Sequence, residues 1–246
     1  MAGRVAPLVR IAVAALACVV AAGWAETTSA AGDQAAASPA SRGLPAPASF
    51  ADNPRVITHY EARTALFADY PPLDGGVAFV GDSLTEGGDW AALFPGVPLR
   101  NYGISGDRAE GVLARHAQIV AARPGRILLM IGTNNLSRGV SPAAVDADVS
   151  ATLDRFRAAL PGTQLVVQSV LPRQPQFDAA IRELNDRLRQ TAARHGAAFV
   201  DLHPAFVVDG GRLDPAVTAD DLHLTSVGYA RWAGLIGRCV REGACG

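Results

Sequence analysis

The segment Val77-Ala78-Phe79-Val80-Gly81-Asp82-Ser83-Leu84-Thr85-Glu86-Gly87 places a short apolar run directly before a polar turn. The run from Val77 to Val80 contains two valines and is typical of a buried strand. In an open sheet of parallel strands, groups at the carboxyl end of a strand face the ligand crevice. The Ser83 hydroxyl is therefore a candidate nucleophile, although Asp82 and Ser83 are also common turn formers and helix caps.

Strand-like and helix-like patterns alternate along the rest of the chain. Further strands are predicted at 99–102, 127–131, 165–170 and 197–202, and helices at 54–70, 107–122, 141–160, 177–195 and 224–238. Asp107 and Glu110 have the spacing of a capping box at the start of one helix. Five strands that alternate with helices predict an α/β fold with a parallel sheet and right-handed crossovers.

The first 25 residues have the order of a secretory signal peptide. Arg4 and Arg10 precede an apolar run at 11–23, which is too short to form a comfortable permanent membrane span. We therefore expect an exported protein, periplasmic or secreted, with no stable membrane span in the mature form. Lipidation of Cys18 is the less favoured alternative, because apolar residues follow this cysteine where a polar tether would be expected.

Composition divides the remaining chain into three parts. Residues 26–54 are rich in Ala, Ser and Pro and predict a flexible linker. Residues 55–240 are expected to form one globular domain, and 241–246 a short tail. Of all 246 residues, 49% are hydrophobic and the formal net charge is −1, so nothing indicates a nucleic-acid partner.

The two cysteines near the C-terminus, Cys239 and Cys245, are six positions apart. In an exported protein they could form a local disulfide, and two unpaired thiols are an equally weighted alternative. No second Cys or His pair lies nearby in the sequence, so a metal site is not expected.

A serine nucleophile requires a base and a group that orients the base. Of the five histidines, His59 precedes the predicted sheet, and His116 and His195 fall within predicted helices. His203 follows the last predicted strand and His223 lies in a polar loop before the last helix, so these two remain.

The loop around His223 has the better arrangement. Asp220 precedes His223 by three residues, a spacing at which a carboxylate in a turn can bind Nδ1 and leave Nε2 toward the serine. His203 is followed directly by Pro204, and the nearby carboxylate of Asp201 belongs to the end of the strand. An Asp-x-x-His pair is by itself common in loops, so an ordinary loop histidine remains the alternative.

Two further loops at strand ends could bind an oxyanion. Gly106 has no side chain to block approach to its N–H, and the Asn134 side chain can donate a hydrogen bond to developing negative charge. Each residue is also an ordinary turn former. Arg108 and Arg138 flank these loops and could contact a polar substrate, although solvated surface arginines are the more common case.

Four blocks of sequence together resemble the SGNH, or GDSL-type, hydrolase superfamily. The matching blocks are Gly81-Asp82-Ser83-Leu84, Asn101-Tyr102-Gly103-Ile104-Ser105-Gly106-Asp107, Gly132-Thr133-Asn134-Asn135 and Asp220-Asp221-Leu222-His223. Gly-Thr-Asn-Asn and Gln168-Ser169-Val170-Leu171-Pro172 are most similar to the platelet-activating-factor-acetylhydrolase-like branch. Many members have Asp where this chain has Asn135, a substitution that the branch tolerates.

The resemblance implies a three-layer, flavodoxin-like α/β/α sandwich. It implies catalytic roles for Ser83 as nucleophile, His223 as base and Asp220 as the acid that orients it. The implied oxyanion hole consists of the Ser83 and Gly106 N–H groups and the Asn134 side chain, with no metal or organic cofactor. Asp82 is expected to hold the turn.

The implied activity is hydrolysis of short-chain acyl esters of carbohydrates or lysolipids through an acyl-enzyme. The alternatives are an O-acyltransferase that acts on cell-wall or exported glycans and a non-catalytic glycan-binding module. The absence of a long insertion between the four blocks favours short acyl chains at an open cleft.

Overall fold

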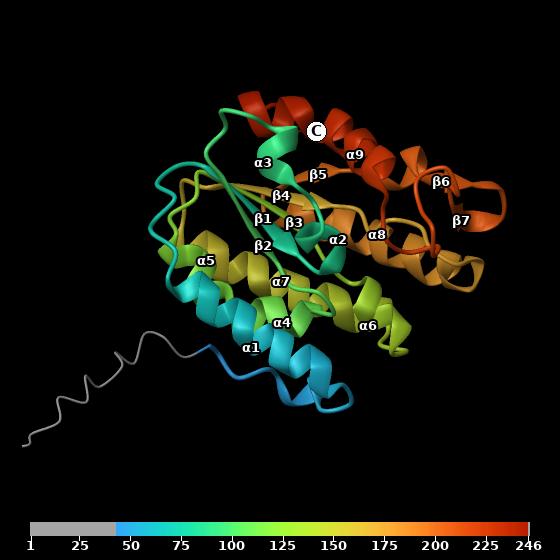
Figure 1. Ribbon diagram of the computed structural model, residues 1–246, viewed down its shortest axis with the longest axis horizontal. Coiled ribbons are helices and arrows are strands. Elements are labelled where there is room, and N and C mark those ends of the chain that lie inside the picture. Colours follow the sequence, from blue (N-terminus) through green and yellow to red (C-terminus); the bar gives the residue numbers. More distant parts are fainter. Residues whose placement is uncertain (1–42, 246) are drawn as a thin grey trace, which may run out of the picture. The chain divides into compact units, whose positions relative to one another are not determined.

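The computed structural model describes residues 43–245. Its main sheet contains five parallel strands in the spatial order β2-β1-β3-β4-β5 (Figure 1). The strands are β1 (Val77–Gly81), β2 (Leu99–Gly103), β3 (Arg126–Met130), β4 (Gln164–Gln168) and β5 (Ala198–Val200). The predicted parallel sheet is confirmed, and β1 pairs with β2 on one side and with β3 on the other.

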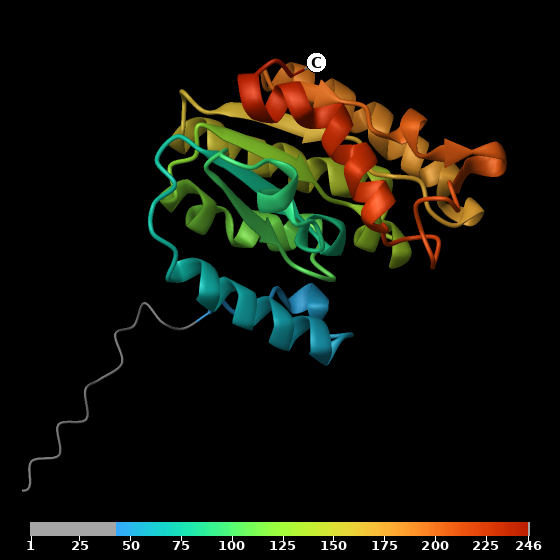
Figure 2. The same ribbon diagram turned by 45° about the horizontal axis from the view of Figure 1, so that its top comes forward.

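Helices cover both faces of this sheet, as the predicted three-layer sandwich requires. The longer helices are α1 (Pro54–Ala68), α7 (Pro142–Ala159), α8 (Asp178–Arg194) and α9 (Ser226–Glu242). The shorter ones are α2 (Ser83–Glu86), α3 (Trp90–Leu93), α4 (Ala109–Ala114), α5 (His116–Ala121) and α6 (Thr133–Ser137). Figure 2 shows α9 on one side of the sheet and α1 on the other.

Alternate residues of each strand enter two separate cores. In β1, Ala78 and Val80 pack in the cluster that includes α1, α7 and α8, whereas Val77 and Phe79 pack in the cluster that includes α3 and α9. All five residues of β1 are buried. A strand covered on both faces has no solvent side, which explains why its sequence shows no polar alternation.

The residues directly before α1 are packed against the domain, so the prediction of a flexible linker is wrong for them. We expected a flexible linker over 26–54, but Phe50 is fully buried and packs edge-on against Tyr60. The backbone N–H of Leu44 donates to the Thr64 hydroxyl at 2.9 Å. The prediction used the average composition of the whole segment, and an average does not show that a single aromatic residue, Phe50, is buried. The predicted signal peptide, the Cys18 alternative and residues 26–42 of the linker lie outside the described residues.

The prediction of one helix over 107–122 is also wrong, because the structure has two helices there, α4 and α5, divided at Arg115. Arg115 is fully buried and its Nη2 lies 2.9 Å from the carboxylate of Asp107, which is equally buried. Asp107 therefore forms an ion pair with Arg115 and is not the predicted cap of the helix. The N-cap position of α4 is Arg108, whose side chain forms no capping hydrogen bond.

The C-terminal end is more ordered than a short tail. Helix α9 extends to Glu242, and the left-handed Gly243 ends it. A disulfide joins Cys239 to Cys245, which decides between the two alternatives for this pair. Across residues 43–245, no helix has the length and apolar character needed to cross a membrane.

Candidate active site

The turn after β1 is fixed by small and buried residues. A side chain at Gly81 would collide with the carbonyl oxygen of Met130 and the Thr85 hydroxyl, so the close approach of β1 and β3 requires glycine. Asp82 caps α2 and accepts a hydrogen bond from the Leu84 N–H at 3.0 Å. This arrangement places Ser83 at the first position of α2.

The Asp82 carboxyl is only 1% exposed. Burial is the main cause that raises its pKa to about 7, and the nearby charge of Asp107 acts in the same direction. A group with this pKa is a mixture of carboxylic acid and carboxylate at neutral pH. Its side chain is joined to the turn backbone, in agreement with a structural role.

Ser83, His223 and Asp220 form a continuous hydrogen-bonded chain. The Ser83 Oγ lies 3.1 Å from Nε2 of His223, and Nδ1 of His223 lies 2.7 Å from Oδ2 of Asp220. The other carboxylate oxygen, Oδ1, accepts the backbone N–H groups of His223 at 2.7 Å and Leu222 at 3.1 Å. The loop thus holds the carboxylate and the imidazole in one relative orientation.

The hydrogen bond from the His223 ring, helped by these two backbone N–H groups, lowers the pKa of Asp220 to about 2. Asp220 is therefore ionised throughout the neutral range. A carboxylate at Nδ1 favours the tautomer that carries the proton there, which leaves a lone pair on Nε2 facing the serine hydroxyl.

Gly106 and Asn134 follow the two strands that flank β1. Gly106 comes after β2 and has φ +81°, a left-handed conformation that glycine adopts without strain. Asn134 comes after β3, and its Nδ2 donates to the carbonyl oxygen of Asp107 at 2.9 Å. An amide nitrogen carries two hydrogens, so this bond orients the group and leaves a second hydrogen for another acceptor.

Asn135 has a separate, structural environment. Its Oδ1 accepts the backbone N–H of Ala109 at 3.0 Å, and its Nδ2 donates to Glu110 at 2.8 Å. The side chain is buried and links α6, the short helix after β3, to α4. An amide supplies both the acceptor and the donor needed here, whereas an ionised Asp would supply only acceptors.

The two arginines beside these loops, Arg108 and Arg138, form hydrogen bonds with the residues that precede α1. Arg108 is 5% exposed, and it donates to the Ser49 carbonyl and to Asp52, so it is not a solvated surface residue. Arg138 also donates to Asp52. The ordered residues before α1 therefore cover one side of the region that carries Asn134.

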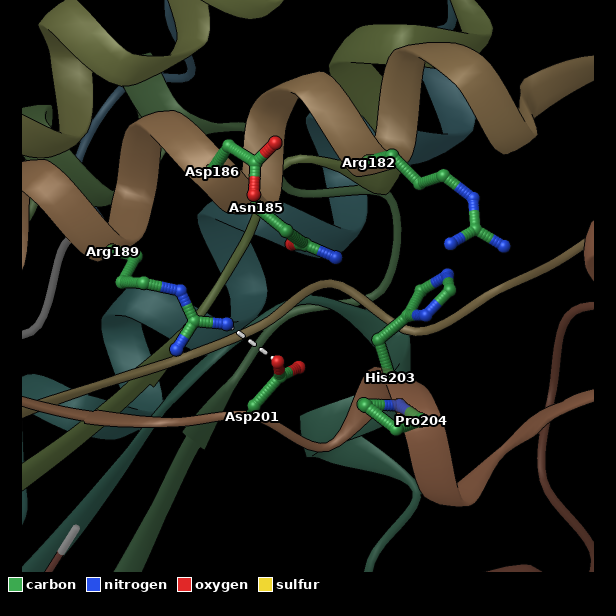
Figure 3. A pocket seen from close by; sticks show the side chains of 7 residues that line it. All are labelled: Arg182, Asn185, Asp186, Arg189, Asp201, His203 and Pro204. Carbon is green, nitrogen blue, oxygen red and sulfur yellow. Dashed lines mark hydrogen bonds and ion pairs between the residues drawn. The ribbon is translucent and has the colours of Figure 1, made fainter.

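The remaining histidines lie in other environments. His203 is buried at the end of β5, in a pocket with Arg182, Asn185 and Arg189 (Figure 3). His195 contacts Asp154 at 3.1 Å and His116 contacts the Leu113 carbonyl at 2.7 Å, both through ring nitrogens. Within residues 43–245, no group of three His, Cys, Asp or Glu side chains is arranged to hold a metal ion.

Two charged side chains near this region were not identified from the sequence. Arg173 is largely buried, donates to the Thr133 carbonyl oxygen at 3.2 Å and lies close enough to Asp82 and Asp220 to interact with both charges. Glu86 ends α2 and binds the loop that contains Gly106, as described below. Neither residue has a recognisable spacing motif, because each contact joins segments that are distant in the sequence.

Comparisons with known proteins identify the family. Residues 79–231 match the model of the GDSL-like Lipase/Acylhydrolase family. Platelet-activating factor acetylhydrolase IB subunit alpha1 from Pongo abelii is 32% identical over 174 residues, which cover 66% of this chain and 74% of that protein. The Homo sapiens protein of the same name is 31% identical over 173 residues, which cover 66% and 74% of the two chains.

Solved structures share the fold. A GDSL-like lipase from Bacteroides thetaiotaomicron superposes with a TM-score of 0.60 at 23% identity, and the match covers 68% of this chain and 88% of that one. A variant of an acetyl-xylooligosaccharide esterase from Geobacillus Stearmophilus gives a TM-score of 0.58 at 18% identity, with 72% and 99% coverage. With the family model and the curated relatives, these matches establish that the chain belongs to the GDSL-like lipase/acylhydrolase family of ester-hydrolysing enzymes.

Proposed function

We propose that this protein hydrolyses short-chain acyl esters with Ser83 as nucleophile, His223 as general base and Asp220 as the acid that orients the base. The observation that carries the proposal is the chain of contacts from Ser83 Oγ to His223 Nε2 at 3.1 Å and from His223 Nδ1 to Asp220 at 2.7 Å. Proton transfer from a serine hydroxyl requires a base within about this distance.

In the first half-reaction, Ser83 Oγ attacks the ester carbonyl carbon and its proton passes to His223 Nε2. The carbonyl π bond becomes a lone pair on oxygen, and this oxyanion accepts hydrogen bonds from the Ser83 and Gly106 N–H groups and from Asn134. The intermediate then collapses, the bond to the alcohol oxygen breaks, and His223 returns the proton to the leaving alcohol. Each oxyanion donor of this kind lowers the barrier by about 3 kcal/mol.

In the second half-reaction, water replaces the alcohol. His223 removes a proton from the water as its oxygen attacks the acyl-enzyme, and then protonates Ser83 Oγ as the acid departs. Asp220 remains ionised in both steps, because its lowered pKa keeps the carboxylate charged while the imidazolium forms. No other proton acceptor is required for the cycle.

The ester is proposed to carry a short acyl group, with acetyl as the leading candidate, on a carbohydrate or lysolipid alcohol. The curated relatives are named acetylhydrolases, and one protein of similar fold is named an acetyl-xylooligosaccharide esterase. Most of the chain between the four motif blocks forms strands and helices of the sandwich, and the exception is a small antiparallel sheet of β6 (Val207–Val208) and β7 (Arg212–Leu213). The proposed site is an open cleft without a lid, which would suit a small acyl group better than a long chain.

The direct test compares wild type and Ser83→Ala on a series of p-nitrophenyl esters from acetate to decanoate, followed by acetylated xylo-oligosaccharides and an acetylated lysophospholipid. We expect the wild type to prefer acetate, and Ser83→Ala to lose at least about 10³-fold in kcat. Labelling of intact protein with a fluorophosphonate, located by peptide mass spectrometry, should modify Ser83. Full activity of Ser83→Ala would contradict the proposal.

We also propose export through the N-terminal 25 residues, with a periplasmic or secreted mature protein. The pattern of Arg4, Arg10 and the apolar run supports this, and the Cys239–Cys245 disulfide fits an oxidising compartment. Cell fractionation with N-terminal sequencing of the purified protein tests it. A cytoplasmic protein that retains Met1 would contradict the proposal.

A further inference from the structure

Glu86 connects the helix that begins with Ser83 to the loop that contains Gly106. It is the last residue of α2, three positions after Ser83. Its Oε2 accepts the backbone N–H of Ser105 at 2.5 Å and the Ser105 hydroxyl at 2.6 Å. One carboxylate oxygen therefore accepts hydrogen bonds from both the backbone N–H and the hydroxyl of the residue that precedes Gly106.

Two side chains of helix α1 also contact the Glu86 carboxylate. Nε2 of His59 lies 2.9 Å from Oε2, and Nε of Arg63 lies 3.3 Å from Oε1. Arg63 also donates to the Gly103 carbonyl oxygen through Nη2 at 2.9 Å. The carboxylate thus lies between two cationic or hydrogen-bonding side chains of α1 and the loop after β2.

This carboxylate is ionised although it is mostly buried. The side chain is 19% exposed, and burial opposes ionisation, but the hydrogen bonds from Ser105 and His59 and the charge of Arg63 outweigh it and hold the pKa of Glu86 below its usual value. A charged acceptor forms shorter and stronger hydrogen bonds than a neutral one. The contacts at Ser105 are of this kind.

The contacts at Ser105 bear directly on the direction of the Gly106 N–H. That N–H belongs to the peptide group between Ser105 and Gly106, so its direction depends on the conformation of both residues. Gly106 has φ +81°, and a Cβ placed on it would lie 2.6 Å from Val56 of α1. A loop residue without side-chain constraints can rotate, whereas a donor must be aimed before reaction to stabilise an oxyanion.

We propose that Glu86 is a positioning residue that aims the Gly106 N–H at the oxyanion by fixing Ser105 relative to the Ser83 helix, with α1 as its support. This inference rests on the proposed function, because it assumes that Gly106 is an oxyanion donor. It assigns to α1, a helix before the first strand, a part in the reaction. Glu86 itself contacts neither Ser83 nor His223 through its described hydrogen bonds.

The test is a steady-state comparison of Glu86→Ala, Glu86→Gln and Ser105→Ala with wild type on p-nitrophenyl acetate. Glu86→Ala removes the hydrogen bonds that fix Ser105. A misplacement of the Gly106 N–H by about 1 Å should lower kcat about 100-fold, while KM changes by less than about threefold. Glu86→Gln keeps an acceptor for Ser105 and should lose only about tenfold in kcat. Ser105→Ala removes one of the two contacts and should lie between wild type and Glu86→Ala.

A second measurement separates positioning from stability. A short trifluoromethyl ketone forms a tetrahedral adduct with the serine, in which Oγ bonds to the carbonyl carbon, the serine proton moves to His223 and the carbonyl oxygen becomes the oxyanion. If Glu86 acts through the oxyanion site, the Ki of this inhibitor should rise by the same factor by which kcat/KM falls. The control Asp146→Asn removes a 14% exposed carboxylate that also binds a hydroxyl and an arginine, on α7, and should leave both constants unchanged.

The outcomes are distinct. Wild-type kcat in Glu86→Ala, or a lower kcat with an unchanged inhibitor Ki, overturns the inference. If Glu86→Ala does not fold, the same criterion applies to Glu86→Gln and Ser105→Ala. Ser83→Ala is assayed in the same series: if that variant keeps full activity, the proposed function itself fails, whereas its inactivity beside an unaffected Glu86→Ala refutes only the role of Glu86.

Discussion

Two histidines near the carboxyl end of the sheet lie in contrasting environments. His223 is half exposed and contacts both Ser83 and Asp220 through its ring nitrogens. His203 is buried, and no hydrogen-bond partner reaches its Nε2 within the described part of the chain. Burial, and secondarily the charge of Arg182, lowers the pKa of His203. His203 is therefore a neutral, packed side chain, whereas His223 is placed to exchange a proton.

The carboxylates beside the two histidines differ in the same way. Asp220 directs one oxygen to the His223 ring and the other to the backbone of its own loop. Asp201 instead forms an ion pair with Arg189 of α8 at 2.5 Å (Figure 3). A histidine near a carboxylate in the sequence is thus insufficient for a catalytic pair, because the carboxylate also has to be directed at the ring.

Replacing each histidine should give the largest difference. His223→Ala removes the proposed base and should lower kcat on p-nitrophenyl acetate on the order of 10⁴–10⁶-fold. His203→Ala lies outside the proposed machinery and should keep kcat within about twofold, since distant substitutions act on stability and not on the barrier. Equal losses in two folded variants would remove the distinction between the two sites.

Replacing the two aspartates is expected to have a smaller effect in the same direction. Asp220→Asn keeps the size of the side chain but no longer stabilises the imidazolium, and it should reduce kcat on the order of 10²–10⁴-fold. Asp201→Asn breaks a partly exposed ion pair and should change the free energy of unfolding by less than about 1 kcal/mol, with kcat unchanged. Parallel steady-state assays and urea unfolding measure both quantities.

The smallest expected effect is on the pH dependence of stability. It tests the role of Asp82 in the turn that positions Ser83. Because the pKa of Asp82 is raised to about 7, the folded state keeps its proton while the unfolded state loses it near the ordinary value of 3.8. The contribution of Asp82 is therefore fully present below pH 3.8, decreases as pH rises toward 7 and is lost above that.

Asp82→Asn cannot ionise and retains an oxygen that can cap α2. Its Tm should fall less than that of wild type between pH 4 and pH 7. A pKa raised from 3.8 to about 7 corresponds to about 4 kcal/mol, and about 1 kcal/mol shifts the Tm of a domain of this size by about 2–4 °C, so the difference should be on the order of 10 °C. Scanning calorimetry over this pH range measures the difference. Identical pH profiles for the two proteins would show that the pKa of Asp82 is not raised in the folded state.

Local patterns predicted those parts of the fold that depend on neighbouring residues in the chain. The five strands and the helix after Ser141-Pro142 follow from apolar runs, a capping serine and a proline at the first helical position. The errors have a common cause. Phe50 and the Asp107–Arg115 pair are buried by partners distant in the sequence, so composition assigned Phe50 to a linker and local spacing made Asp107 a cap.

The candidate site residues could all be predicted without the structure: a serine after a buried strand, Asp220 three residues before His223, and Gly106 and Asn134 after other strands. The strand order is visible only in the folded chain: β1 lies between β2 and β3, which brings Ser83 between the segments that carry Gly106 and Asn134. The same order puts β5 three strand spacings, roughly 14 Å, from β1, which separates His203 from Ser83. Spacing along the chain governs contacts within one turn or loop, whereas contacts between loops depend on how the strands pair.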